Sequence, residues 1–187
     1  MELETILNKI YVLPPEAIQA ITECVSVVDH PKGHILLKEN KIENNIFLIK
    51  KGIVRAYSVF DGTEVTFWFG KEGDPVISMK SYVEGKKGYE SIELLEDSTF
   101  YKINSKNLQR LFIENTAIAN WGRKFAELEL IKTEERLISL QFKNASQRYS
   151  DLINQNSEII KRVPLGIIAS YLGITQVSLS RIRAEVK

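Results

Sequence analysis

The sequence has 187 residues, of which 44% are hydrophobic and 26% charged, and its formal net charge at pH 7 is +1. These values are ordinary for a globular protein of one large domain or two small ones, and they exclude low-complexity and disulfide-rich chains. No apolar run approaches the roughly 20 residues of a membrane span, and no basic start precedes an apolar block, so we expect a cytoplasmic protein with no membrane partner.

Residues 1–113 form the first predicted zone, which opens with two short helices at about 3–10 and 15–22, separated by a proline pair. From 24 to 103 the pattern changes to short segments that are rich in β-branched and aromatic residues and punctuated by glycine. The dipeptide Asp61-Gly62 lies between two of these segments and supports the positive φ angles of a tight hairpin turn. Many short strands at near-even spacing predict an antiparallel barrel or jelly roll.

Residues 114–143 are helical by composition, and no proline interrupts them. Four apolar residues recur at a spacing of three or four and predict a seam that pairs with the same helix of a second chain: Ile118, Trp121, Phe125 and Leu128. The alternative is an ordinary amphipathic helix that packs on its own domain. Three later leucines are candidates for packing against another part of the chain: Leu130, Leu137 and Leu140.

Residues 144–187 form the third zone, which begins with one or two helices that end before Pro164. Six basic and three acidic residues give the segment 146–187 a charge of +3, which leaves −2 for the rest of the chain. This asymmetry permits a nucleic-acid partner at the C-terminal end.

The last stretch, IIASYLGITQVSLSRIRAEVK, predicts two helices joined by a sharp turn. The first helix, about Leu165–Tyr171, places the small residue Ala169 where the second helix crosses it. Gly173 occupies the turn, where only glycine adopts a left-handed backbone without steric strain. Thr175 is placed to cap the second helix. The alternative is a terminal helical hairpin that only packs.

The second helix separates into two faces when it is wound at 3.6 residues per turn. Its buried face carries Leu179, Ile182 and Val186, and its open face carries Val177, Ser180, Arg181 and Ala184, with Gln176 on the flank. Arginine pairs with guanine, glutamine pairs with adenine, and a small apolar side chain contacts the thymine methyl, so three residues are predicted to read bases: Gln176, Val177 and Arg181. Three others are predicted to contact phosphates: Thr175, Ser178 and Arg183.

The stretches ASYLGITQVSLSRIR and KKGIVRAYSVFDGTEVTFWFGKEGDPV, with the order of the three zones, resemble the Crp/Fnr family of bacterial transcription regulators. The resemblance implies an α+β fold with a jelly-roll-like, cyclic-nucleotide-binding-type β-roll, a dimerising helix and a helix-turn-helix domain. It also implies a homodimer on a near-palindromic double-stranded DNA operator, with RNA polymerase as a candidate partner. Because the sequence ends at Lys187, close to the end of the second helix, we expect the family's wing strands to be truncated or absent.

The resemblance also locates an effector pocket in the β-roll, but the residues that hold cyclic AMP in the family are altered here. Gly73-Asp74 stands in place of a Gly-Glu pair, and the later stretch has Gly88 at the position of the phosphate-binding arginine. The remaining candidate pocket residues surround this glycine: Lys86, Lys87, Tyr89, Glu90 and Ser91. A buried phosphate needs a charge-assisted donor, and Glu90 would repel it. We therefore do not expect cyclic nucleotide binding in the usual way, although a lysine could substitute for the arginine.

Two alternatives for the β-roll stay open, namely a different small effector, or no ligand and a structural or partner-docking role. An enzyme is not expected, because the chain has no Gly-rich phosphate loop and no nucleophile or zinc motif. His30 and His34 are too few for a cupin metal centre, and Cys24 alone cannot bind an iron–sulfur cluster, so we expect no metal. Cys24 is predicted to pack in the interior. A further alternative is a sensor protein whose helix-turn-helix no longer binds DNA.

Overall fold

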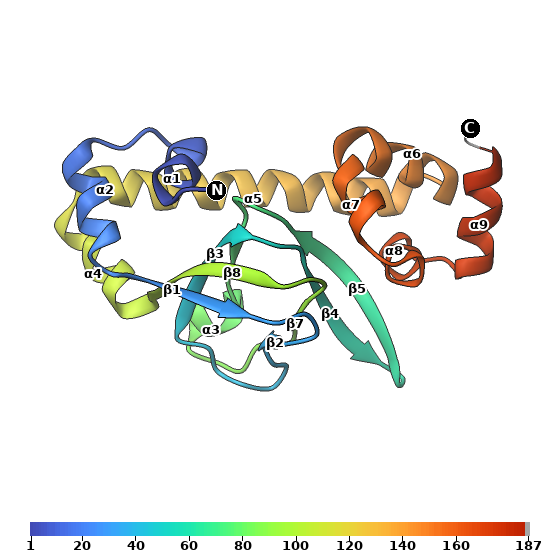
Figure 1. Cartoon of the computed structure of the whole chain (residues 1–187), viewed down its shortest axis with the longest axis horizontal. Helices are drawn as coiled ribbons and strands as arrows, with labels where there is room; N and C mark the ends of the chain where they lie inside the picture. Colours follow the sequence, from blue (N-terminus) through green and yellow to red (C-terminus); the bar gives the residue numbers. More distant parts are fainter. Residues whose placement is uncertain (186–187) are drawn as a thin grey trace.

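The computed structural model describes residues 1–185 and shows a β-roll beneath one long helix, with a cluster of helices at each end of that helix (Figure 1). The helices are α1 (Leu3–Ile10), α2 (Pro15–Thr22), α3 (Met79–Glu84), α4 (Ser105–Glu114), α5 (Thr116–Phe142), α6 (Ala145–Gln155), α7 (Ser157–Arg162), α8 (Leu165–Leu172) and α9 (Gln176–Glu185). The strands are β1 (Val25–His30), β2 (Ile35–Leu37), β3 (Asn45–Lys51), β4 (Val54–Phe60), β5 (Thr63–Gly70), β6 (Pro75–Val76), β7 (Ser91–Leu94) and β8 (Ser98–Asn104). The predicted α+β architecture is confirmed.

The β-roll consists of two four-stranded antiparallel sheets with the strand orders β1-β8-β3-β6 and β2-β7-β4-β5. Apolar side chains from both sheets fill the space between them, among them the fully buried Ile49, Leu94 and Phe100. The predicted hairpin is confirmed, because β4 and β5 pair across a turn in which Asp61 has a φ of 48° and Gly62 a φ of 74°. The sequence patterns alone do not predict α3, α4 or the two-residue strand β6.

Helix α5 packs its N-terminal part on a core formed by α1, α2, α4 and the first sheet. Ile118 is fully buried there, and the indole Nε1 of Trp121 donates a hydrogen bond to the Leu7 carbonyl at 3.0 Å. Cys24 is half-buried against the same core. This packing corrects the prediction that Ile118 and Trp121 belong to an intermolecular seam, because the chain's own N-terminal helices cover them.

The C-terminal part of α5 behaves in the opposite way. Leu130, Leu137 and Leu140 keep 60%, 55% and 46% of their surface exposed, so their expected packing within the chain is wrong. Ile131 and Ile138 are exposed beside them. At 100° per residue, Leu130 and Leu137 lie opposite Trp121, and Ile131 and Ile138 lie on the adjoining flank, about 80–100° from Trp121. We call these four residues the outer face of α5.

Helices α6 to α9 form a compact unit around a second core to which all four contribute. Helices α8 and α9 meet at 93°, within the range of a helix-turn-helix. Gly173 joins them with a φ of 68°, and the Ile174 amide donates to the Ala169 carbonyl at 3.0 Å, so the predicted glycine turn is confirmed. Among residues 1–185, no single helix is long and apolar enough to cross a membrane, although α8 and α9 together pass that test as one bent pair.

Replacing Gly173 with alanine tests this turn. A Cβ atom there would meet nothing within 4 Å, so the left-handed backbone is the only source of strain. We expect Gly173→Ala to lower the free energy of unfolding by about 1–2 kcal/mol in urea titrations. Gly166→Ala, at a position without a positive φ, is the control and should change it by less than about 0.5 kcal/mol. Equal effects of the two substitutions would contradict the assignment of the strain to Gly173.

Candidate functional site

Helix α9 is held against α8 by its inward face and is capped at its N-terminus. Leu179 is fully buried in the second core, and Ile182 is half-buried beside it. The Thr175 hydroxyl accepts a hydrogen bond from the Ser178 amide at 3.1 Å, which confirms the predicted cap. Val186, the third residue predicted for this inward face, lies outside the described residues.

Helix α9 lies at the far end of the C-terminal helices, away from the β-roll (Figure 1). Its residues Gln176, Val177, Ser180, Arg181 and Ala184 are all exposed, and Val177 keeps 64% of its surface. These side chains rise from a rigid helix whose other side is buried. The arrangement presents polar and small apolar groups in one row, which is what reading of base edges requires.

Arg183 differs from Arg181 in its surroundings. It lines a small cavity of about 40 Å³ together with residues of α6, α7 and α8 such as Tyr149 and Ile160. The side chain therefore lies along the body of the C-terminal domain. At 100° per residue, Arg183 lies about 20° from Gln176 around α9, two turns further along the helix.

In the roll, the stretch around Gly88 is tied into the protein through its backbone. The Gly88 amide donates to the Lys41 carbonyl at 2.9 Å, and the Gly88 carbonyl accepts from the Asn40 amide at 2.9 Å. A Cβ atom on Gly88 would lie 2.6 Å from the Ser78 Oγ and 3.0 Å from a Glu90 oxygen. Lys86 and Lys87 are exposed. Close packing at Gly88 therefore leaves no room for a longer side chain without displacement of its neighbours.

Glu90 lies in this stretch with only 6% of its surface exposed. Its Oε2 accepts a hydrogen bond from the Tyr89 amide at 3.0 Å, and its Oε1 is buried without a hydrogen-bond partner in the described part of the chain. The Glu90 carboxylate thus already accepts from the Tyr89 amide, a donor that an anionic ligand could otherwise use. Ser78 and Ser81, joined by a hydrogen bond of 3.1 Å, line the same place and were not predicted as pocket residues.

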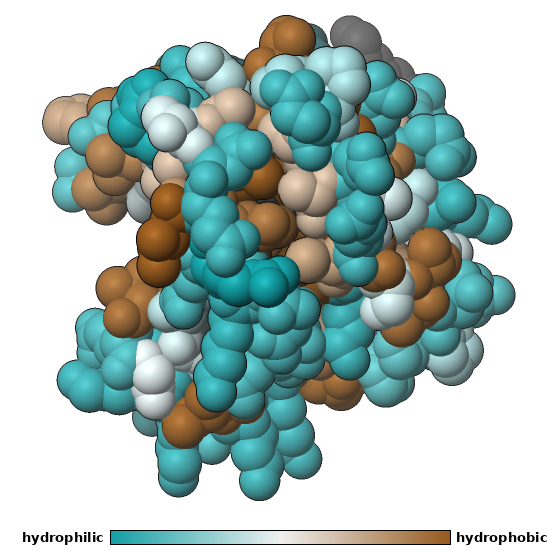
Figure 2. All heavy atoms as spheres, turned by 90° about the vertical axis from the view of Figure 1, so that its left-hand side faces the viewer, coloured by the Kyte–Doolittle hydropathy of each residue, from teal (hydrophilic) through white to brown (hydrophobic). Residues whose placement is uncertain are grey.

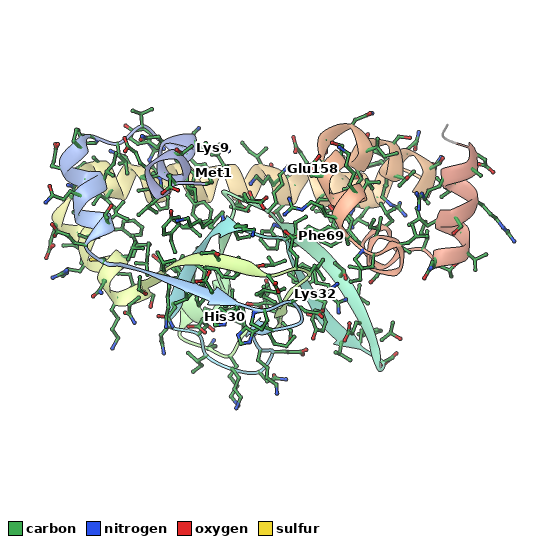
Figure 3. The ribbon with its side chains drawn as sticks, viewed as in Figure 1. Met1, Lys9, His30, Lys32, Phe69 and Glu158 are labelled. Atoms are coloured by element: carbon green, nitrogen blue, oxygen red, sulfur yellow. The ribbon has the colours of Figure 1, made fainter. Side chains whose placement is uncertain are left out.

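Gly73 and Asp74 lie elsewhere, beneath α5. A Cβ atom on Gly73 would face Met1 and Lys9, both labelled in Figure 3 above the roll. Asp74 accepts from the Lys71 amide at 3.0 Å and lies 3.9 Å from the Lys132 Nζ. Burial raises the pKa of Asp74, and the Lys71 amide and Lys132 offset this only in part. No described contact joins this pair to the stretch 86–91.

The outer face of the second sheet, which meets the C-terminal helices, contains one buried arginine between the inward-facing Val54 and Ala56. Arg55 donates through Nε to Glu93 at 2.6 Å and through Nη2 to Glu64, and it also reaches the Thr66 hydroxyl at 3.4 Å. One guanidinium with two carboxylates leaves a net negative charge. This cluster lies outside the inter-sheet core, so within the roll it is Glu90, buried beside Gly88, that disfavours an anionic ligand.

The two histidines lie together, His30 at the end of β1 and His34 in the loop before β2. The rings of His30 and His34 stack at a centroid distance of 4.1 Å and an angle of 5°. Burial lowers the pKa of His30, and His34 and Lys102 lower it further, while Asp29 opposes them. Within residues 1–185 there is no group of three or more His, Cys, Asp or Glu side chains that could hold a metal ion.

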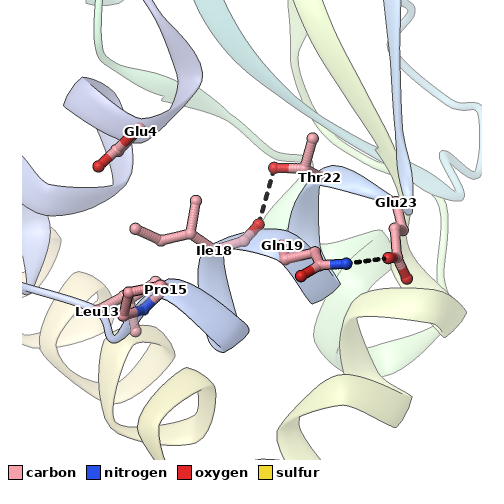
Figure 4. Close-up of a pocket in the computed structure, with 7 residues that line it drawn as sticks. All are labelled: Glu4, Leu13, Pro15, Ile18, Gln19, Thr22 and Glu23. Atoms are coloured by element: carbon pink, nitrogen blue, oxygen red, sulfur yellow. Dashed lines mark hydrogen bonds between the residues drawn. The ribbon is translucent and has the colours of Figure 1, made fainter.

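A further hollow lies between α1 and α2. It has a volume of about 390 Å³ and an apolar lining flanked by Glu4 and Glu23 (Figure 4). The side of the molecule that carries α1 and α2 faces the viewer in Figure 2, where apolar side chains show between polar ones. None of the predicted site residues lines it.

Comparison with known proteins agrees with this architecture. Residues 27–115 match the family described as the cyclic nucleotide-binding domain. A comparison with curated protein sequences finds no match.

Three solved structures with the same fold cover most of the chain. FixK2 from Bradyrhizobium japonicum has a TM-score of 0.74 at 18% identity, over 87% of this chain and 84% of that one. The catabolite activator protein of Thermus thermophilus has a TM-score of 0.61 at 16% identity, over 97% and 86%. A protein from Eubacterium rectale described as a regulator of the Crp/Fnr family has a TM-score of 0.72 at 17% identity, over 91% and 82%. The chain therefore has a β-roll of the cyclic nucleotide-binding type, followed by a long helix and C-terminal helices as in Crp/Fnr structures.

Proposed function

We propose that this protein is a cytoplasmic, sequence-specific DNA-binding transcription regulator of the Crp/Fnr type. The observation that carries the proposal is the pair α8 and α9, crossing at 93° with Gln176, Val177 and Arg181 exposed in one row on α9. The fold shared with the Thermus catabolite activator protein supports it. RNA polymerase stays a predicted partner.

In this proposal, Arg181 forms a bidentate pair with guanine, Gln176 pairs with adenine and Val177 contacts a thymine methyl. Thr175 and Ser178 lie at the first turn of α9, where hydroxyls and backbone amides contact phosphate. The net charge of +3 over residues 146–187 supports the approach of this end of the molecule to DNA.

The homodimer is proposed to form through the outer face of α5. Its four residues, Leu130, Ile131, Leu137 and Ile138, are between 49% and 60% exposed and follow one side of a continuous helix. Phe125 and Leu128, predicted for the seam, are half-buried and lie towards the roll with Trp121. A two-fold pair of such helices would present two copies of α9 to half-sites about 34 Å apart.

The roll is proposed not to hold a cyclic nucleotide in the usual way. Two features support this: Gly88 provides no guanidinium, and Glu90 occupies the Tyr89 amide. A different effector, or a purely structural roll, stays open.

The first test of the proposed function is a selection from random duplex DNA with the purified protein, at low and at near-physiological salt. We expect enrichment of a two-fold symmetric motif and a steep loss of affinity with salt, because phosphate contacts release counterions. The absence of any enriched motif at both salt concentrations would favour the alternative, a sensor or docking protein whose helix-turn-helix does not bind DNA.

Arg181→Ala should weaken binding to the preferred site by about 1–3 kcal/mol and relax the base preference at one position. Fluorescence anisotropy on the selected site and on a library of single-base variants measures both effects. Arg110→Ala, which removes an exposed arginine of α4, is the control and should change neither. An equal loss on random DNA would make Arg181 a phosphate contact.

The double variant Leu137→Glu/Ile138→Glu should weaken dimerisation by at least about 3 kcal/mol, because two apolar side chains lose their burial and two charges enter the contact. Analytical ultracentrifugation at several concentrations measures the dissociation constant. Ile113→Glu changes an isoleucine that is 87% exposed on α4 and should leave the dimer intact. A wild-type protein that sediments as a monomer at micromolar concentration would contradict the homodimer.

Titration calorimetry with cyclic AMP should show no saturable binding up to about 1 mM, a range that detects even weak ligands. Gly88→Arg should not create a site, because its Cβ atom would lie 2.6 Å from the Ser78 Oγ, and it should lower the melting temperature. Micromolar binding of cyclic AMP to the wild-type protein would show that the stretch 86–91 rearranges.

A further inference from the structure

Strand β5 is the edge strand of the second sheet, so one side of its backbone has no strand partner. Such an edge presents unpaired amides and carbonyls. Here the Ser170 hydroxyl of α8 accepts a hydrogen bond from the Thr66 amide at 3.0 Å and donates one to the Glu64 carbonyl at 3.1 Å. One serine thus makes the two bonds that a residue of an adjacent strand would make.

A second contact joins the same two parts of the chain through charge. Arg162, the last residue of α7, donates to both carboxylate oxygens of Glu72, at 2.8 Å and 3.1 Å, and also to Glu96. Glu72 is held in place by the Gly52 amide at 2.9 Å. The guanidinium is therefore fixed between two loops of the roll by paired hydrogen bonds, the strongest kind of contact that arginine makes.

Apolar and stacking contacts surround these bonds. The rings of Phe69, labelled at the end of β5 in Figure 3, and Tyr171 lie 4.9 Å apart. The guanidinium of Arg136 in α5 stacks on the Tyr171 ring, 3.9 Å from the ring centre. It also donates a hydrogen bond to the Tyr171 carbonyl. Ile53 and Leu95 of the roll belong to the same core as α8 and α9. Helix α8 is thus in contact with the roll and with α5 at once.

The hairpin of β4 and β5 also contacts the candidate effector stretch. The Ser58 hydroxyl donates to the Tyr89 carbonyl at 2.5 Å, and the Tyr89 ring lies 6.4 Å from that of Phe67. One face of the hairpin therefore meets residues next to Gly88 and Glu90, while its free edge holds α8.

We infer that α8 docks on the free edge of β5, with Ser170 and Arg162 as positioning residues that fix the reading face of α9 relative to the roll of its own chain. The docking is a property of the chain by itself. Its consequence for base reading rests on the proposed function.

Hydrogen exchange on the full chain tests the docking, with Ser170→Ala and Arg162→Gln alone and combined. We expect the Thr66 amide to exchange about tenfold faster in Ser170→Ala, because the serine is its described acceptor. Amides of β4, a strand paired on both sides, should keep their protection and so report that the roll is folded. In the double variant, the amides of α8 should lose protection as well.

Two matched controls remove the same groups where they make no contact between domains. Ser150→Ala removes a hydroxyl that makes a hydrogen bond within α6. Lys161→Gln removes the charge of the residue before Arg162; in the described structure, Lys161 pairs only with Glu158. Neither should change exchange at Thr66. Unchanged exchange at Thr66 in Ser170→Ala would overturn the docking.

The positioning role is measured by binding of the same variants to the selected site and to random DNA. We expect the double variant to lose affinity for the selected site by a larger factor than for random DNA, since a misplaced α9 keeps its phosphate contacts. If hydrogen exchange shows that the docking is lost but the preference for the selected site is unchanged, the positioning role is overturned. A wild-type protein that selects no DNA would instead overturn the proposed function, and the Thr66 exchange would still decide the docking.

Discussion

One side of helix α5 packs against the rest of its own chain along most of the length of the helix. Trp121 is buried on the N-terminal helices, Lys132 lies at Asp74 beneath the middle of the helix, and Arg136 stacks on Tyr171 near its end. These contacts share one side of the cylinder, so they fix the rotation of the helix relative to both the roll and the C-terminal domain. The outer face of α5 is apolar and exposed because the inner face is already occupied, and this rotation determines where a second chain can pair.

The parts of the fold that depend on local chemistry could be predicted from the sequence. The hairpin follows from Asp61-Gly62, the turn before α9 from Gly173, and the cap from Thr175, since each needs only its own backbone geometry. The proposed dimer face could not be predicted, because α5 carries apolar residues on two sides and a single sequence period cannot assign them. The role of Ser170 could not be predicted either, because it depends on the free edge of β5, about 100 positions earlier in the chain.

The Glu90 carboxylate occupies the stretch beside Gly88. It takes the Tyr89 amide, so this donor already has an anionic partner, while Arg55 is engaged by Glu64 and Glu93 on the outer face of the second sheet. The predicted pocket had two halves, and the structure separates them because Gly73 and Asp74 turn towards α5. Ser78 and Ser81, which have no distinctive sequence pattern, lie beside Gly88 instead. Glu90 therefore disfavours an anionic ligand beside Gly88.

The joint between α8 and β5 limits how such an effector could act. Burial alone would raise the pKa of Glu72, but hydrogen bonds from Arg162 and the Gly52 amide overcome it and lower the pKa to about 2. A carboxylate with a lowered pKa contributes its stabilisation at all pH values above its unfolded pKa and loses it only as the pH falls towards 2. The ion pair therefore stays intact throughout the physiological range. Protonation of Glu72 therefore does not release α8 in this range, and the β4–β5 hairpin is an element that contacts both α8 and the stretch beside Gly88.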